Sequence, residues 1–194
     1  MVEMKKKYKI EARRFGLINW VGAWTLYKKE VLRFLIVWVQ TIFSPLISSL
    51  LFLLVLSLAI GTERGEVLGV PFIIFLAPGL IATQVIQQSF SHSSSSFMIG
   101  KIQGNIVDLL YAPLSATEIT ISVCLAAVTR SFMIAAISIL TFYLIIDIQI
   151  KHFFTLVLFT FLSSFILGNI GTIAGLWAEK FDHMASVTNF VIVP

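Results

Sequence analysis

The sequence predicts an all-α integral membrane protein, a polytopic helical bundle. Of its 194 residues, 58% are hydrophobic and 12% are charged, whereas soluble proteins average about 45–50% apolar and about 25% charged residues. Four apolar runs are long enough to cross a hydrocarbon core of about 30 Å, which requires about 20 helical residues. These runs occupy about 34–60, 67–86, 119–146 and 153–177, and a partial fifth run occupies 185–194.

The segment 1–18 is basic and is expected to lie in the cytoplasm. Nine of the 14 lysines and arginines precede the first span, and cytoplasmic segments of membrane proteins are enriched in these residues. The N-terminus is therefore expected on the cytoplasmic side of the cell membrane. The connections 89–118 and 178–184 are expected on the same side, and the short connections between spans one and two and between spans three and four on the outer side.

The segment 19–33 predicts an amphipathic helix that lies in the membrane interface. Apolar residues recur at steps of three and four and form one stripe, namely Leu17, Trp20, Trp24, Tyr27, Val31 and Phe34. Lys28, Lys29 and Arg33 lie mostly off this stripe. Such a helix places tryptophans at lipid headgroups and cations toward anionic lipid. An ordinary juxtamembrane anchor is the alternative.

The first two spans contain residues that disturb a helix or are polar. Pro45, five residues after Gln40, predicts a kink in span one, and a kinked polar helix suits either a pathway lining or simple packing. In span two, the APG sequence at 77–79 predicts another break, and Gln84 follows it. The serine-rich run after Gln88 is either a linker or a helix that continues past the bilayer, and we expect the helix.

Arg130 is the charged residue deepest within a predicted span. It lies about a dozen residues into span three, roughly 16–18 Å along the helix and so near the membrane midplane. A charge there costs about 2.5–3.5 kcal/mol on insertion scales and marks the bundle interior. Its partners are expected among carbonyls, glutamines, water, further helices or an anionic substrate.

Other side chains favour packing over chemistry. Gly171 and Gly175 form a small-xxx-small ridge in span four, suited to close packing within the bundle or across a dimer. Cys124 is expected to be a small buried side chain. The histidines, at loops or segment ends, lack the spacing of metal ligands; they are His92, His152 and His183.

A short amphipathic segment between Gly104 and Pro113 predicts a two-turn helix over about 105–112. Asn105 is expected to cap its start, and Pro113 prevents it from continuing. Three apolar residues are expected to share one side of it: Ile106, Leu109 and Leu110. A helix this short is marginal in water, so it packs either on its own bundle or on a soluble partner.

Four segments together resemble the permease subunit of ABC-2 type exporters, in the branch that exports drugs, polysaccharides or Nod-factor-like molecules. They are TLYKKEVLRF, FLAPGLIATQVIQQSF, KIQGNIVDLLYAPLSATEI with the following VTRS, and GLWAEKFDHMASVTNFVIVP. The resemblance covers nearly all of the chain from about Trp20 onward. It implies a transmembrane domain over 34–194, preceded by an elbow helix over 19–33.

The resemblance also implies a six-span subunit that works as a dimer, in the membrane lipid, with two separate ATPase subunits. ATP and Mg²⁺ bind to those partners; no cofactor is expected on this chain, and no nucleic acid. A coupling helix over 105–112 docks on the ATPase, with these expected contact residues: Asn105, Ile106, Asp108, Leu109, Leu110, Tyr111 and Pro113. Because the sixth span of the family is absent, the chain is expected to continue beyond Pro194.

The sequence therefore favours a transport subunit over an enzyme. It lacks a GxxxxGK[ST] phosphate loop, so the energy of ATP is expected to come from a partner. The alternative is an integral membrane enzyme acting on lipid-linked substrates, for which the candidate groups are Asp108, Glu118, Glu179, Asp182 and His183. An ion-coupled carrier would need acidic residues or histidines within the spans, and none is expected there.

Overall fold

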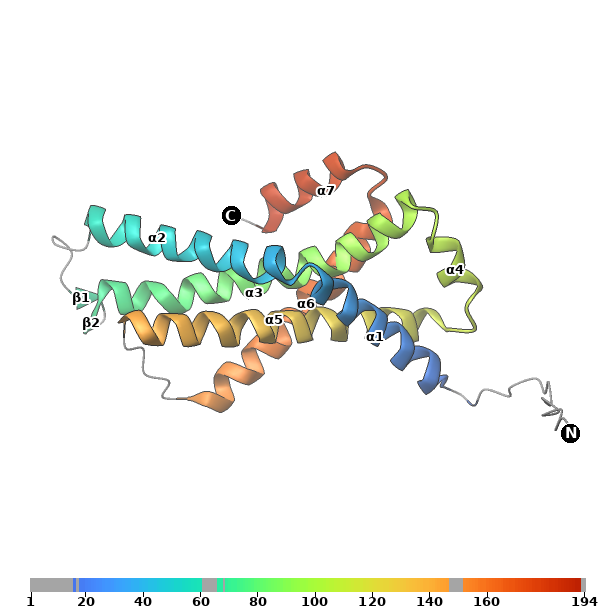
Figure 1. Cartoon of the computed structure of the whole chain (residues 1–194), viewed down its shortest axis with the longest axis horizontal. Coiled ribbons are helices and arrows are strands. Elements are labelled where there is room, and N and C mark those ends of the chain that lie inside the picture. Colours follow the sequence, from blue (N-terminus) through green and yellow to red (C-terminus); the bar gives the residue numbers. More distant parts are fainter. Residues whose placement is uncertain (1–15, 17, 61–65, 68, 147–151, 193–194) are drawn as a thin grey trace, which may run out of the picture.

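The computed structural model describes residues 16, 18–60, 66–67, 69–146 and 152–192. The described chain is a bundle of helices (Figure 1). Its α-helices are α1 (Trp20–Ile36), α2 (Ser44–Ile60), α3 (Phe72–Ile102), α4 (Ile106–Tyr111), α5 (Ala116–Ile146), α6 (Phe153–Trp177) and α7 (Phe181–Val187). Two π-helical turns, η1 (Val39–Phe43) and η2 (Thr188–Ile192), and a hairpin of β1 (Glu66–Val67) and β2 (Val70–Pro71) complete it.

Among the described residues, four helices are long and apolar enough to cross a membrane. They are Val39–Ala59, Phe72–Ile102, Ala116–Ile146 and Phe153–Trp177. The predicted all-α polytopic fold is thus confirmed, apart from the two-residue strands of the hairpin. The basic segment 1–15, Leu17 and the charged connections at 61–65 and 147–151 lie outside the described residues.

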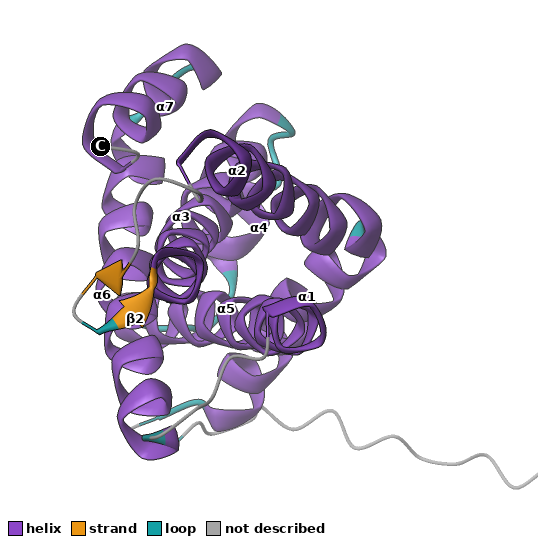
Figure 2. Ribbon diagram, turned by 90° about the vertical axis from the view of Figure 1, so that its left-hand side faces the viewer, coloured by secondary structure: helices purple, strands orange, loops and turns teal. Residues whose placement is uncertain are grey.

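The long helix α3 occupies the middle of the bundle. It makes its most extensive contacts with α6 and α5, and α1 packs on α5. In the view along the bundle, α3 lies among α2, α5 and α6 (Figure 2). The hairpin lies at one end of the bundle, whereas α4 and the start of α1 lie at the other (Figure 1).

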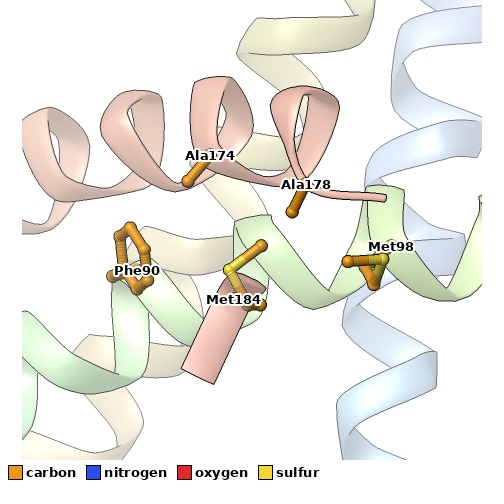
Figure 3. Packing of buried hydrophobic residues seen from close by; sticks show 5 residues of the cluster. All are labelled: Phe90, Met98, Ala174, Ala178 and Met184. Carbon is orange, nitrogen blue, oxygen red and sulfur yellow. The ribbon is translucent and has the colours of Figure 1, made fainter. Parts of the chain in front are cut away.

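Small residues bring α6 directly against the backbone of α3. A Cβ atom on Gly171 would lie 2.6 Å from the Phe90 carbonyl oxygen, and one on Gly175 would lie 2.7 Å from that of Ser94. The predicted glycine ridge therefore packs within the chain. Beside this crossing, α3, α6 and α7 bury an apolar cluster (Figure 3), which comprises Phe90, Met98, Ala174, Ala178 and Met184.

Span two differs from its predicted bounds and shape. Val67 lies in β1, and the helix begins at Phe72, because Gly69 adopts a positive φ of 78° in the hairpin turn. The predicted break at 77–79 was wrong: α3 runs through Pro78. Pro78 is the seventh residue of α3, so its missing N–H removes one backbone bond, which a packed helix tolerates. The expected continuation through the serine run is confirmed, since α3 reaches Ile102.

The other boundaries shift by a few residues. The irregular backbone in span one precedes Pro45, because α1 ends at Ile36 and the wider turn η1 follows. The connection expected over 178–184 is shorter, because α7 already begins at Phe181. Cys124 is fully buried, as expected. The bounds of α6 match the predicted span 153–177.

Candidate functional site

A polar cavity of about 990 Å³ lies between the α1–η1–α2 segment and α3, with one residue from α5. Its wall on α3 runs from Leu80 to Ile99, which is about 28 Å at about 1.5 Å per residue. Most lining side chains carry an amide, a hydroxyl, a guanidinium or an imidazole, namely Arg33, Gln40, Thr41, Ser44, Ser48, Ser49, Thr83, Gln84, Gln87, Gln88, Ser91, His92, Ser95 and Arg130. So many polar groups facing one space between apolar helices mark it as a candidate site.

The four residues predicted to line a pathway or the bundle interior share this cavity: Gln40, Pro45, Gln84 and Arg130. Gln84 is buried and joins three segments. Its Nε2 donates to the Pro45 carbonyl oxygen at 2.7 Å, and its Oε1 accepts from Ser138 Oγ at 3.0 Å. The amide thereby fixes the proline region of α2 against α3 and α5.

Arg130 lies halfway along α5 and faces the cavity. Its Nη2 donates to Gln88 Oε1, so a glutamine is one of the expected partners. Its Nε is buried without a hydrogen-bond partner. Within the described ranges, both ion pairs of the chain involve Glu30, and neither includes Arg130.

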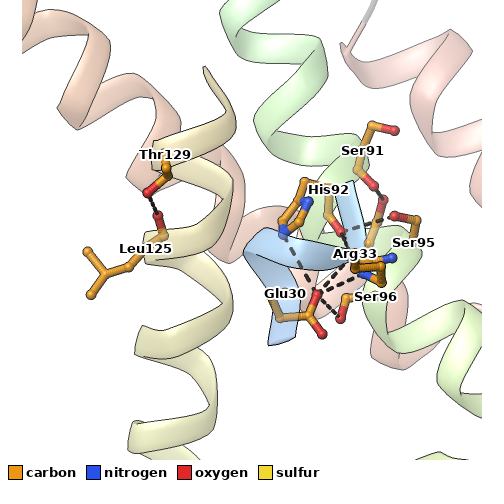
Figure 4. Close-up of polar contacts among 9 residues, drawn as sticks. Glu30, Arg33, Ser91, His92, Ser95, Ser96, Leu125 and Thr129 are labelled. Atoms are coloured by element: carbon orange, nitrogen blue, oxygen red, sulfur yellow. Dashed lines mark hydrogen bonds and ion pairs between the residues drawn. The ribbon is translucent and has the colours of Figure 1, made fainter. Parts of the chain in front are cut away.

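α1 and α3 meet through a cluster of four residues, in which Glu30 and His92 are buried and Arg33 and Ser96 are half-buried (Figure 4). Glu30 Oε2 lies 2.9 Å from Arg33 Nη2 and accepts from Ser96 Oγ at 2.8 Å. Arg33 Nη2 also donates to the His92 carbonyl oxygen at 3.1 Å. These bonds join α1 to α3 and neutralise Arg33.

Glu30 and His92 meet inside the bundle but outside the predicted spans, within which no acidic residue or histidine was expected. His92 is part of α3, not of a loop, and its ring is fully buried 3.7 Å from Glu30 Oε2. The reason is the length of α3, which carries His92 well past the predicted end of span two. Glu30 was missed, although it follows Leu26 and precedes Phe34 at steps of four, the spacing of one helix face.

The face of α1 that packs on the bundle shares Phe34 with the apolar stripe predicted to meet the membrane interface, but otherwise differs from it. Leu26, Glu30 and Phe34 are its buried residues, whereas Trp20 and Trp24 are exposed. Among the other residues of the predicted elbow helix, Lys28 and Lys29 are also exposed.

The remaining elbow contacts are local or reach α5. Lys28 Nζ lies 5.4 Å from the centroid of the Trp24 ring, and Trp24 stacks on Tyr27. The Tyr27 hydroxyl lies 2.9 Å from Thr129 Oγ1 on α5. The two tryptophans are thus free to meet a lipid surface.

The predicted coupling segment forms the six-residue helix α4, which contacts the end of α3 through its half-buried residues Ile106 and Leu109 but is otherwise exposed. None of its residues is buried against the described chain. Leu110 is 72% exposed and Tyr111 is 86% exposed. Together with Val107 they occupy positions i, i+3 and i+4, so α4 presents one apolar side outward. Val107 was not among the predicted contact residues.

One detail of this segment differs from expectation. Asn105 does not cap α4, because its backbone is already helical (φ −73°, ψ −7°) and its Nδ2 donates to Gln103 Oε1. Ile106, Leu109 and Leu110 occupy positions i, i+3 and i+4 as expected, with Leu110 exposed and the other two half-buried. Asp108 and Pro113 are exposed.

A clasp of three residues, Asn19, Pro113 and Glu118, joins the exit of α4 to the start of α1. Asn19 Nδ2 donates to the Pro113 carbonyl oxygen at 2.9 Å, and its Oδ1 caps α1 by accepting from Gly22 N at 3.0 Å. The Asn19 backbone N–H donates to Glu118 Oε1 at 2.5 Å. We call this arrangement the Asn19 clasp.

The same Glu118 closes a capping box at the start of α5. Its Oε2 accepts from Ser115 N at 2.7 Å, and Ser115 Oγ accepts from Glu118 N at 3.3 Å. The α4–α5 connection is therefore tied to both adjoining helices, α1 and α5. The clasp was not predicted, because Asn19 and Pro113 are 94 residues apart in sequence.

The groups considered for a membrane enzyme do not converge. Glu179, Asp182 and His183 are all exposed, and the His183 ring contacts Trp177 at 5.8 Å between centroids. Within the described residues, no three histidine, cysteine or acidic side chains are grouped as metal ligands.

Comparisons with known proteins agree with the architecture. The sequence profile of the ABC-2 type transporter family matches residues 22–194. The chain is 29% identical over 177 residues to the inner membrane transport permease YadH of Escherichia coli K12 and, equally, to YadH of Shigella flexneri; the match covers 91% of this chain and 69% of each relative. No solved structure matches significantly. The chain therefore belongs to the ABC-2 type transporter family, as a membrane permease and not an enzyme.

Proposed function

We propose that this permease is the membrane subunit of an exporter driven by a separate ABC ATPase, which binds α4. The observation that carries the proposal is the exposed apolar side of α4, formed by Val107, Leu110 and Tyr111. A two-turn helix with this surface is marginal in water and gains stability from a partner. ATP and Mg²⁺ bind to that ATPase.

The connections of α4 suit it to move the bundle. Gly104, with a positive φ of 75°, joins α4 closely to α3, and the Pro113–Ser115 turn joins it to α5. Through the Asn19 clasp, a displacement of α4 also reaches α1. These three helices carry Arg33, Gln88 and Arg130 on the wall of the polar cavity, so the displacement changes access to that cavity.

The orientation follows from the same proposal. Since ABC ATPases bind nucleotide in the cytoplasm, α4 and the start of α1 face the cytoplasm, and the β1–β2 hairpin faces outward. The relative YadH is named an inner membrane permease, which supports the same location here. Two copies, embedded in lipid, form the pathway for an amphipathic or lipid-linked substrate.

The docking of the ATPase is tested by co-purification of the tagged permease with a candidate ABC ATPase. Leu110→Asp places a charge on the apolar side of α4 at an exposed position, and we expect it to abolish retention of the ATPase while the permease elutes normally. Gln103→Asp, at an exposed position before α4 that is not among the expected contact residues, is the matched control and retains the ATPase. Equal retention by both variants would exclude α4 as the docking element.

A further inference from the structure

The cavity holds a positive charge that the protein itself leaves unbalanced. Of its two arginines, Arg33 is paired with Glu30, whereas Arg130 contacts the neutral amide of Gln88 and keeps a buried Nε without a partner. The described lining contains no aspartate or glutamate. An arginine at mid-helix depth is costly unless its charge is compensated, so an anion in the cavity would lower that cost.

Neutral donors surround the same space. Gln40 from η1 and Gln87 and Gln88 from α3 face it, together with hydroxyls such as Ser48 and Ser91. Amide and hydroxyl groups complete the hydrogen bonding of an oxyanion, while the guanidinium supplies charge and paired N–H donors. This set of groups fits phosphate oxygens.

Apolar side chains line the cavity alongside the polar groups. Phe52 and Leu80 lie at one end, and Phe34 and Ile99 lie near Arg33 at the other. The α1–η1–α2 segment runs antiparallel to α3. Two hydrogen bonds fix its register, from Gln84 Nε2 to the Pro45 carbonyl oxygen and from Arg33 Nη2 to the His92 carbonyl oxygen. A volume of about 990 Å³ is at the upper end of the 300–1,000 Å³ typical of ligand pockets. The shape and polarity therefore suit an amphiphile.

We propose that the cavity is a binding site for a phosphate-bearing anionic headgroup, with Arg130 as its charged contact and with the apolar part of the ligand toward Phe52 and Leu80. This inference rests on the proposed function and names the substrate class of the export pathway. Two sources carry this chemistry, a phospholipid or lipid-linked headgroup and a free phosphoryl compound.

The test uses the purified permease in neutral detergent, without an ATPase. Native mass spectrometry measures binding of phosphatidylglycerol and of zwitterionic phosphatidylcholine. We expect phosphatidylglycerol to bind more tightly, and Arg130→Gln to weaken its binding about tenfold or more, since a hydrogen bond to a charged group is lost. Lys180→Gln removes the same charge from an exposed position outside both the cavity and the elbow helix, and it is expected to leave binding unchanged.

A second variant keeps both arginines and blocks the space. Ser48 is exposed on the α2 wall, so Ser48→Trp fills the cavity without altering the buried core, and we expect the same loss of binding. If millimolar inorganic phosphate competes with phosphatidylglycerol, the result supports the site and shows that a phosphoryl group alone is sufficient for binding. If only another lipid competes, the result supports an amphiphilic ligand.

The proposal is overturned if the two lipids bind equally, or if phosphatidylglycerol binds the Arg130→Gln and Ser48→Trp variants as it binds the parent protein. Because no ATPase is present, either result leaves the docking of α4 untouched. Conversely, failure of the Leu110→Asp experiment would not alter lipid binding, so the two hypotheses fail separately.

Discussion

Replacement of Asn19 by alanine isolates the link between α4 and α1. The Asn19 side chain is almost fully buried and makes two hydrogen bonds, one to the first turn of α1 and one to the Pro113 carbonyl oxygen. Alanine removes both, while the backbone N–H can still donate to Glu118. The substitution therefore loosens the clasp and leaves the α5 capping box in place.

The expected cost is the sum of two terms. Loss of an N-cap side chain costs about 1 kcal/mol, and loss of the bond to a part-buried carbonyl costs about 1 kcal/mol. Together these give about 2 kcal/mol, or a factor of about 30 in the equilibrium between closed and open clasp. The effect is local, because the hydrogen bonds of Glu30 and Arg33 to α3 still hold α1 in place.

Hydrogen–deuterium exchange of the detergent-solubilised protein measures this opening directly. We expect amides in the first turn of α1, including Gly22, to exchange about 30-fold faster in Asn19→Ala. Asn105→Ala is the matched control, since that asparagine is exposed and caps no helix, and it should leave α1 unchanged. Equal exchange in parent and Asn19→Ala proteins would refute the clasp.

Two further substitutions and one labelling experiment test the packing of the helices. Gly171→Leu is expected to lower stability by about 3 kcal/mol, because its Cβ would meet the Phe90 carbonyl oxygen at 2.6 Å; a lower thermal midpoint in detergent shows it. Gln84→Leu should cost about 1–3 kcal/mol in the same assay, because it removes the donor to the Pro45 carbonyl oxygen. Cys124, which is fully buried, should react with a thiol reagent only after denaturation.

Matched controls separate a loss of packing from a general sensitivity of the protein to substitution. Ile173→Leu changes an exposed position on the other side of α6, and Gln103→Leu changes an exposed amide after α3; both are expected to keep the parent midpoint. If Gly171→Leu matched Ile173→Leu, the close contact between α6 and α3 would be wrong. Labelling of native protein at Cys124 would show that the core around it is open.

The spans and their polar interior could be predicted because each depends on local sequence. The length of an apolar run fixes whether a helix can cross a bilayer, and this placed α6 at its observed bounds. Gln40, Gln84 and Arg130 could be singled out because polar groups in apolar helices turn toward the bundle interior, and they line the same cavity. Their role in transport stays a prediction.

Contacts between distant segments could not be predicted in this way. The bond from Arg33 to the His92 carbonyl oxygen joins residues 59 apart, and its existence depends on how α1 crosses α3. The role of Asn19 as a cap depends likewise on the backbone, which is helical at Asn105 and not at Asn19. Residue type alone suggests a cap at both positions.

The central claim is that an ATPase binds α4 and moves it with its nucleotide cycle. The most direct test is a disulfide crosslink from Leu110→Cys, in a protein whose Cys124 is replaced by alanine, to single cysteines on a candidate ABC ATPase. We expect a specific crosslink whose yield changes when ATP is bound, because Leu110 is exposed on the outward side of α4. The claim would be contradicted if the cysteine at this position crosslinked to no co-expressed ATPase and was instead protected from thiol reagents within the permease.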